Sequence, residues 1–267
     1  MSQLHRFSRT ELLVGKAGLD RLKGAHVALF GLGGVGSYAA EALCRSGIGT
    51  ITIVDFDDIC LTNLNRQLHA TTDTVGLAKS DVMARRMRSI NPDAEIRPFK
   101  AFYNADSSPE LLLDNGYDYV LDAIDHITAK LHLLATCREL GIPVIASMGA
   151  AGKLDPTKIT VADISETHSC RMARAVRKLL KKRGVVSGIK TVYSTEEARI
   201  DEAHQGGCGS NCICPNKDDQ QFSCEHRRVI LGSSAHIPAI FGLTMAGVVV
   251  NDLLTPTVVS VPRPPAV

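Results

Sequence analysis

Three glycines with the spacing G-x-G-x-x-G, at Gly31, Gly33 and Gly36, are suited to holding a phosphate, and Gly34 lies in the same loop. Glycine lets the backbone turn tightly and come close to a phosphate, whose charge the N-terminus of a following helix stabilises. Asp55 comes nineteen residues after Gly36, where a carboxylate accepts hydrogen bonds from ribose hydroxyls. Taken alone, these residues predict a dinucleotide site of the kind that binds NAD or FAD.

The polar residues after Asp55 indicate a different nucleotide. A second carboxylate, two amides and two cations follow it: Asp57, Asn63, Gln67, Arg66 and Lys79. An arginine and a lysine beside a phosphate loop suit a triphosphate that must be neutralised and cleaved. The alternative is that Arg66 and Lys79 are solvated surface charges. Together the residues favour an ATP site, in which Arg66 and Lys79 are catalytic.

Two further carboxylates, Asp122 and Asp125, flank a turn after another apolar segment. Carboxylate oxygens are ligands that Mg²⁺ accepts, and the ion usually bridges to substrate phosphates. The alternative for Asp125 is the N-cap of the next helix. We therefore expect Mg²⁺ with the ATP, with Asp125 as a catalytic residue and Asp122 as a cofactor-binding one.

Alternating strands and helices must position these residues. We expect strands over 25–30, 50–54, 94–98, 117–121, 144–147, 158–163 and 191–194, and helices over 10–23, 35–46, 75–90, 127–140, 172–183 and 235–254. The alternation up to about residue 150 predicts a doubly wound, mostly parallel, Rossmann-like α/β sheet with a C-terminal extension packed on it. Because ligands bind at the carboxyl ends of such strands, one site can collect the glycine loop, Asp55 and Asp122.

The length and composition suit one domain over residues 1–254, followed by a disordered tail over 255–267. Its parts are a nucleotide-binding core at 25–150, a substrate-facing, cysteine-rich part at 151–234 and a C-terminal helix at 235–254. That helix approaches membrane-spanning length, but Pro238, Asn251 and Asp252 favour a buried core helix and no membrane partner. The polar N-terminus lacks a secretory signal, which predicts a cytoplasmic protein.

A strongly basic segment follows the core. Residues 171–183 contain no acidic residue, and the candidate RNA-binding cations are Arg171, Arg174, Arg177, Lys178, Lys181 and Lys182. Four of them, Arg171, Arg174, Lys178 and Lys181, follow near-helical spacing along one face. An apolar side is supplied by Met172, Val176, Leu179 and Leu180. Such a face can neutralise RNA phosphates without reading sequence, although a solubilising surface helix has the same pattern.

Four cysteines gather in a polar stretch with the spacing C-x3-C-x-C-x9-C: Cys208, Cys212, Cys214 and Cys224. In a chain without a secretory signal, clustered thiols are more often metal ligands than disulfides. The spacing suits either zinc or an iron–sulfur cluster and does not separate them. The alternative is a set of free or redox-active thiols.

The nucleotide motifs resemble those of the ubiquitin-activating-enzyme superfamily, which includes the bacterial MoeB, ThiF and HesA proteins. The resemblance spans about residues 6–165 and rests on the segments GLGGVGS, DFD, NLNRQ, VGLAKSD, INP and DAID. It implies that Asp55 binds ribose, that Arg66 and Lys79 contact phosphates and that Asp122 or Asp125 engages magnesium. It also implies a homodimer in which Arg9 reaches the partner subunit's ATP.

The downstream half resembles the tRNA-modifying branch of this superfamily, through GAAGK at 149–153, the basic helix and GSS at 232–234. The resemblance implies ATP-dependent dehydration and cyclisation of N6-threonylcarbamoyladenosine in tRNA through an acyl-adenylate, with release of pyrophosphate and AMP. That branch is associated with cysteine desulfurase partners. The alternatives are adenylation of a ubiquitin-like sulfur-carrier protein, a nucleotide-dependent binding module without turnover, and an NAD oxidoreductase.

Overall fold

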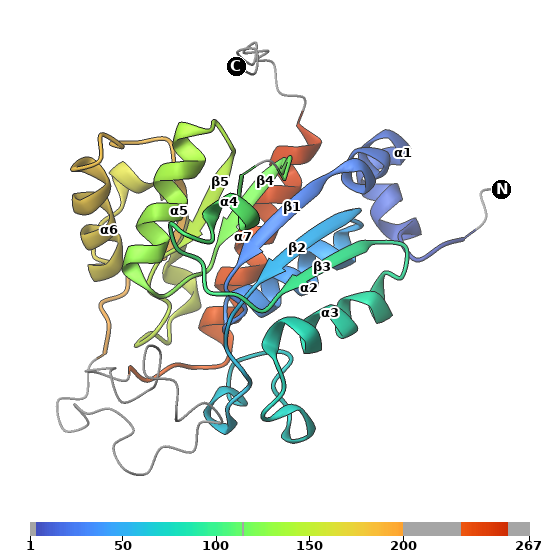
Figure 1. Cartoon of the computed structure of the whole chain (residues 1–267), viewed down its shortest axis with the longest axis horizontal. Helices are drawn as coiled ribbons and strands as arrows, with labels where there is room; N and C mark the ends of the chain where they lie inside the picture. The colour runs from blue at the N-terminus through green and yellow to red at the C-terminus, as the bar shows by residue number, and fades with distance from the viewer. Residues whose placement is uncertain (1–3, 114, 200–230, 256–267) are drawn as a thin grey trace.

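The computed structural model describes residues 4–113, 115–199 and 231–255 (Figure 1). Its centre is a seven-stranded sheet with the order β3-β2-β1-β4-β5-β7-β6, in which only β6 is antiparallel to its neighbour. The strands are β1 (His26–Phe30), β2 (Thr50–Val54), β3 (Glu95–Phe99), β4 (Tyr119–Asp122), β5 (Val144–Ser147), β6 (Ile159–Asp163) and β7 (Lys190–Ser194). The predicted mostly parallel, Rossmann-like sheet is confirmed.

Helices cover both faces of this sheet. One face carries α1 (Ser8–Gly24), α2 (Gly36–Ser46), α3 (Lys79–Ile90) and α7 (His236–Leu254). The other face carries α4 (Ser108–Leu111), α5 (Ile127–Glu139) and α6 (Arg171–Lys181). Because each central strand is covered on both sides, its residues form a continuous apolar run, such as Val27 to Phe30 in β1, which are fully buried.

Helix α7 runs behind the strands in Figure 1 and packs most extensively against α2. Its side chains Ile237, Phe241, Met245 and Val249 recur every four residues and are all fully buried. A Cβ at Gly242 would lie 2.2 Å from the carbonyl oxygen of Val35, so glycine allows the two helices to approach closely. Although α7 is long and apolar enough to cross a membrane, it serves here as the expected core helix.

Helix α3 begins four residues later than predicted. Gly76 has a φ of 87°, and Ala78 is extended and forms an isolated β-bridge with Asp58. A left-handed glycine and an extended residue cannot belong to an α-helix. The prediction of a helix from residue 75 is therefore wrong, and Lys79 becomes the first helical residue.

Within the described ranges, four short 3-10 helices and the short α4 lie in the connections, and one 3-10 helix shares its last residue, Lys158, with the predicted strand at 158–163. The 3-10 helices are η1 (Leu61–Asn63), η2 (Thr72–Thr74), η3 (Pro156–Lys158) and η4 (Ile164–Glu166). The backbone of Gly152 joins two distant segments, because its N–H donates to Gly232 and its carbonyl accepts from Arg199, both at 2.7 Å. We call this pair of bonds the Gly152 junction.

The strand order reverses between β1 and β4. The chain passes from β1 outward to β2 and β3, then crosses back to place β4 on the other side of β1. In open α/β sheets ligands bind at this reversal, outside the carboxyl ends of the strands. The loops after β1, β2 and β4 therefore define the place where a nucleotide would bind.

Candidate nucleotide site

The glycine loop after β1 contains glycines of two kinds. Gly31 has a φ of 93°, and a Cβ there would lie 2.7 Å from the carbonyl oxygen of Ala123. A Cβ at Gly36 would lie 1.8 Å from the carbonyl oxygen of Gly31, so the fold itself requires both glycines. A Cβ at Gly33 would meet no described atom within 4 Å. The space beside Gly33 is therefore open to a ligand that approaches the backbone.

Asp55 connects the glycine loop to the end of β2. Its Oδ2 accepts from the N–H of Leu32 at 2.6 Å, and its Oδ1 accepts from the N–H of Asp57 at 2.9 Å. Burial raises the pKa of Asp55 above its ordinary value, although nearby Lys79 opposes the rise. Because each carboxylate oxygen has more than one acceptor site, Asp55 can shape the loop and still accept from a ribose.

Lys79 places a buried cation beside the glycine loop. Its Nζ lies 2.6 Å from Asp57 Oδ2 and 3.9 Å from Asp55 Oδ1, with its side chain only 5 % exposed. Burial favours the neutral amine, but the carboxylates of Asp55 and Asp57 outweigh this effect and raise the pKa of Lys79. Lys79 is thus not a solvated surface charge, and it keeps a buried positive charge beside the glycine loop.

The segment around η1 brings Arg66 to the same place. A Cβ at Gly34 would lie 3.3 Å from Arg66 Cγ and 3.0 Å from Pro238, so these residues border the glycine loop. Arg66 Nη1 donates to the carbonyl of Thr62 and to Asn65 Oδ1, both at 2.8 Å. These bonds keep the half-buried guanidinium beside the loop.

The amides of this segment have separate partners. Asn63 Oδ1 accepts from the N–H of Cys60 at 3.0 Å, so the carbonyl side of this predicted cofactor-binding residue caps η1. Asn65, which the sequence analysis did not single out, donates to the carbonyl of Ser233 at 2.9 Å. That bond ties the segment to the start of α7.

Among the buried polar side chains that lack a hydrogen-bond partner within the described residues, two lie in the segment that follows η1. They are Gln67, through its Oε1, and His69, through both ring nitrogens. Burial and the charge of Lys79 lower the pKa of His69 to about 3, so the imidazole is neutral at physiological pH. Native proteins rarely leave such groups unpaired, which fits a site that a ligand or water completes. His69 was given no role from the sequence.

The two carboxylates after β4 have different surroundings. Asp122 is fully buried, and its Oδ2 lies 2.6 Å from the equally buried Nζ of Lys130. This placement corrects the expectation that Asp122 binds the cofactor, because its side chain does not reach the site surface. Asp125 is exposed, and its charge acts on Lys79. His126, not Asp125, caps α5, so the N-cap alternative for Asp125 is wrong.

A cation at this site would need the nucleotide as well as the protein. The described residues hold no group of three or more His, Cys, Asp or Glu side chains that could surround a metal ion. Mg²⁺ needs no such group, because it keeps several waters and commonly binds through one or two carboxylates plus substrate phosphates. The exposed Asp125 beside the phosphate loop fits that requirement. The predicted metal ligands Cys208, Cys212, Cys214 and Cys224 lie outside the described residues.

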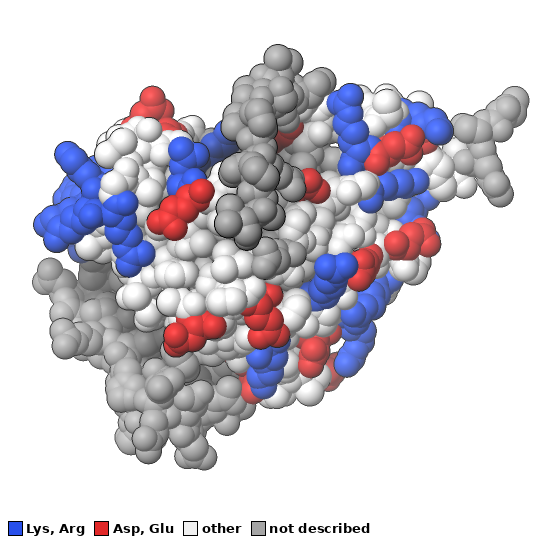
Figure 2. All heavy atoms as spheres, turned by 45° about the horizontal axis from the view of Figure 1, so that its top comes forward, with Lys and Arg blue, Asp and Glu red and all other residues white. Residues whose placement is uncertain are grey.

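Helix α6 carries the predicted basic face. Lys and Arg side chains gather at the end of the molecule where Figure 1 places α6 (Figure 2). The apolar side of α6, through Ala173, Val176 and Leu180, is fully buried against α5 and the sheet. The exposed cations are Arg171, Arg174, Lys178, Lys181 and Lys182. The helix is therefore amphipathic as predicted, with its charge turned outward.

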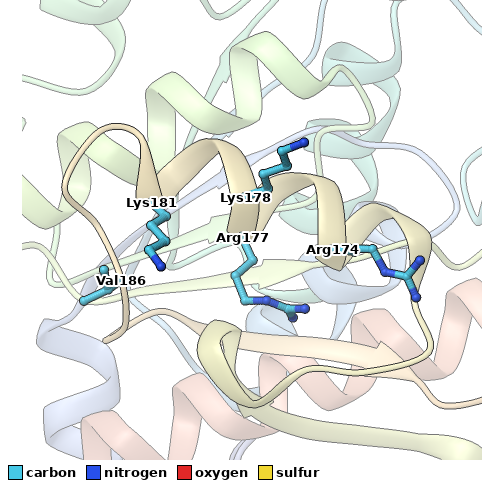
Figure 3. Close-up of a pocket in the computed structure, with 5 residues that line it drawn as sticks. All are labelled: Arg174, Arg177, Lys178, Lys181 and Val186. Atoms are coloured by element: carbon cyan, nitrogen blue, oxygen red, sulfur yellow. The ribbon is translucent and has the colours of Figure 1, made fainter.

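A cavity of about 440 Å³ is bordered by three of these cations, by the half-buried Arg177 and by Val186 (Figure 3). Within the described part of the chain, the side chains of Arg174, Lys178 and Lys181 make no hydrogen bond or ion pair. Arg177 differs, because its Nη1 donates to the carbonyl of Thr167 at 2.7 Å and also to the Thr167 hydroxyl. Arg177 thus anchors α6 to η4, a role that the charge pattern did not predict.

Arg9 lies far from the nucleotide loops of its own chain. The neighbouring Arg6 donates to the carbonyl of Ile90 at the end of α3, and Phe7 packs beside Gly47 before β2 begins. The parallel strands begin on this side of the sheet, which we call its amino edge. The glycine loop and Lys79 lie where the strands end, at the carboxyl edge. The side chain of Arg9 is exposed and makes no polar contact with the described residues.

The fold and the site together define a nucleotide-binding α/β protein built to hold a polyphosphate at the reversal of its strand order. The cation Lys79 and the exposed Asp125 are features of this site that the dinucleotide fingerprint does not include. The chain belongs to the ThiF family, whose sequence pattern matches residues 7–262.

Several characterised proteins are similar to the chain. It is 44% identical over 254 residues to the tRNA threonylcarbamoyladenosine dehydratase of Bacillus subtilis (strain 168), covering 94% of this chain and 95% of that protein. It is 45% identical over 198 residues to the protein of the same name from Escherichia coli (strain K12), covering 72% and 74%. The crystal structure of the E. coli dehydratase TcdA in complex with ATP has a TM-score of 0.79 and 35% identity, and covers 93% of each chain.

Proposed function

We propose that the chain uses ATP to dehydrate N6-threonylcarbamoyladenosine in tRNA and close it into a ring. The observation that carries the proposal is the buried, charged Lys79 beside an open glycine loop at the point where the strand order reverses. The similar proteins of B. subtilis and E. coli support the same substrate, because their names specify this modified nucleoside. The E. coli crystal structure supports ATP as the co-substrate.

The reaction takes place in two steps. A carboxylate oxygen of the threonyl group attacks the α-phosphorus of ATP, the bond to pyrophosphate breaks, and an acyl-adenylate forms. The neighbouring carbamoyl group then attacks the activated carbonyl carbon, AMP leaves, and the ring closes. Over both steps the nucleoside loses one water molecule, and the elements of that water appear in the AMP and pyrophosphate formed from ATP. Because the second step is intramolecular, its effective molarity is high, and no enzyme nucleophile is required.

The chain's own residues supply positioning and charge in this scheme. Lys79 and Arg66 neutralise the phosphates as the negative charge shifts toward pyrophosphate. Asp55 accepts hydrogen bonds from the ribose, and Gln67 offers its unpaired Oε1 to the nucleotide. Asp125 would hold Mg²⁺, which supplies further neutralisation of the phosphates when it is bound.

A homodimer completes the site in this proposal. Arg9 is exposed at the amino edge of the sheet, so it is poorly placed for the nucleotide of its own chain. A second copy could present its Arg9 to this nucleotide instead. The exposed leucines next to Arg9, Leu12 at 88 % and Leu13 at 85 %, offer apolar surface for such a contact.

The tRNA would lie along α6. The exposed face of this helix carries four cations and no acidic residue, Lys182 follows as its C-cap, and Arg174, Lys178 and Lys181 are not paired with described residues. Phosphate contacts of this kind fix the position of an RNA without reading its sequence. We leave Arg177 out of this face because it is bonded to Thr167.

The metal at the four cysteines, a cysteine desulfurase partner and a cytoplasmic location stay predictions from the sequence. The competing function is adenylation of a ubiquitin-like sulfur-carrier protein, which shares the first step but not the substrate.

ATP–pyrophosphate exchange tests the proposal directly. We expect exchange by the purified protein to depend on tRNA that carries threonylcarbamoyladenosine, and Lys79→Ala to lower it by at least about 100-fold, because one main phosphate charge is lost. Lys16→Ala is the control, since Lys16 lies on the exposed surface of α1. Exchange that depends on a carrier protein and not on tRNA would favour the competing function.

A further inference from the structure

Lys130 is a buried lysine in the first turn of α5. Its Nζ donates to Asp122 Oδ2 at 2.6 Å and to the carbonyl of Ser147 at 3.0 Å. These acceptors are the last residues of the neighbouring strands β4 and β5, and the side chains of Lys130 and Asp122 are both fully buried. One amine therefore links the carboxyl ends of two strands to the start of a helix.

Stability alone does not explain this ion pair. Two ions removed from water lose hydration, and a well-packed apolar pair often stabilises a core at least as well. A cation near the N-terminus of a helix is also opposed by the helix dipole. The residues that follow Lys130, Leu131, Leu133 and Leu134, show that this environment accepts apolar side chains. The pair is better explained by the backbone geometry that it imposes on the neighbouring turn.

The pair controls the turn that carries Asp125. The second oxygen of Asp122 accepts from the N–H of Ile124 at 3.0 Å, which closes the turn. On its other side the turn is pressed against the glycine loop, because Ala123 donates to Phe30 and its carbonyl leaves no room for a Cβ at Gly31. The turn is thus held between the phosphate loop and Lys130, and Asp125 follows Ile124 directly.

We propose that Lys130 is a positioning residue which, through Asp122, fixes the turn that presents Asp125 to the magnesium ion of bound ATP. This proposal rests on the proposed function of the site. It assigns Asp122 a role in support of Asp125, instead of direct contact with the cofactor. It also assigns a role to Lys130, which neither the motifs nor the charge pattern of the sequence had marked.

The test removes both charges together, because one unpaired buried charge would endanger folding. We expect the double variant Lys130→Met/Asp122→Leu to keep a melting temperature close to that of the wild type. Calorimetry with a non-hydrolysable ATP analogue should give a Kd about tenfold or more higher when Mg²⁺ is present, as for other residues that orient a metal ligand. The Kd in excess EDTA should be unchanged.

A matched control lies at the opposite edge of the sheet. Lys190 and Asp252 form an ion pair of the same length, 2.6 Å, at the start of β7. The variant Lys190→Met/Asp252→Leu should leave both dissociation constants unchanged. Asp125→Asn should reproduce the magnesium-dependent loss, and its combination with the Lys130→Met/Asp122→Leu pair should add little to it.

Three other results would overturn the proposal. If the double variant binds the analogue as the wild type does while Asp125→Asn does not, the pair is only part of the core, and the proposed function still stands. An equal loss with and without Mg²⁺ would mean general damage to the site. If Asp125→Asn itself has no effect, the magnesium role of Asp125 fails, and the positioning role fails with it.

Discussion

Gly33 differs from the other two glycines of the G-x-G-x-x-G loop in what surrounds it. Gly31 and Gly36 contact the backbone around them so closely that no other residue fits, whereas Gly33 faces open space. In a loop at the carboxyl ends of the strands, where ligands bind in this fold, that space leaves room for a phosphate to approach the backbone. The pattern G-x-G-x-x-G predicts all three residues but cannot distinguish these two reasons.

The substitution Gly33→Ala should therefore act on binding and not on folding. We expect about tenfold weaker ATP affinity by calorimetry, because a methyl group would occupy the approach of the phosphate. Thermal unfolding should change little. Gly31→Ala is the matched control and should lower the free energy of unfolding by roughly 1–3 kcal/mol, because of its positive φ. Unchanged ATP affinity in Gly33→Ala would mean that the nucleotide lies elsewhere.

Some site residues could be predicted from the sequence, and others could not. Lys79 and Asp55 come from a recognisable pattern, because their types and spacing suit a triphosphate. The buried location of Asp122 depends on which residue of α5 turns toward the end of β4. A lysine eight positions later is an ordinary residue in the sequence, and only the packing of α5 on the sheet brings its amine to 2.6 Å from Asp122. The burial of the His69 ring without a hydrogen-bond partner likewise depends on tertiary packing, so the sequence could not predict it.

At the scale of elements, hydrophobic patterning predicted the strands and the larger helices well. Buried parallel strands such as β2 and β5 are short, apolar and rich in β-branched residues, so their pattern stands out. The predicted start of α3 was wrong because apolar residues continue through 75–78, where the left-handed Gly76 and the bridge between Ala78 and Asp58 keep the backbone out of the helix. The short helix α4 carries too few residues for a periodic signal.

Helix α6 has a charge pattern whose role can be tested apart from its stability. We expect Lys178→Glu/Lys181→Glu to weaken tRNA binding by about tenfold or more at 100 mM salt, because two attractive interactions with phosphates become repulsive. The slope of log affinity against log salt should fall by about 0.7–0.9 for each phosphate that the helix no longer neutralises. A filter-binding titration at several salt concentrations measures both quantities.

The matched control for this helix is Arg177→Ala. Because Arg177 donates to Thr167, its removal should lower the melting temperature but leave the salt slope nearly unchanged. If the two glutamate substitutions do not alter tRNA affinity, α6 is a solubilising helix, and the tRNA binds another surface.

At the scale of the whole molecule, the residues predicted for the site lie at opposite edges of the sheet. The glycine loop and Lys79 lie at the carboxyl edge, and Arg9 lies at the amino edge. The doubly wound fold could be predicted from the alternation of strands and helices, because each parallel strand needs a crossover. The position of Arg9 relative to its own site required the packing of α1 beside the end of α3.

Mixing two defective subunits tests the shared site. Arg9→Ala and Lys79→Ala should each have little exchange activity as homodimers. After the two are mixed and allowed to exchange subunits, half of the dimers should contain one intact site, which restores about a quarter of the wild-type activity. A mixture that stays inactive despite demonstrated subunit exchange would show that Arg9 serves no neighbouring site.

The Gly152 junction has a consequence for how this chain can vary. Its two hydrogen bonds hold Arg199 and Gly232 on either side of a single residue, although 32 residues lie between them in the sequence. The described chain therefore leaves and re-enters the fold at nearly the same point, next to the end of β7 and the start of α7. A substitution that weakened either bond would loosen both of these points together.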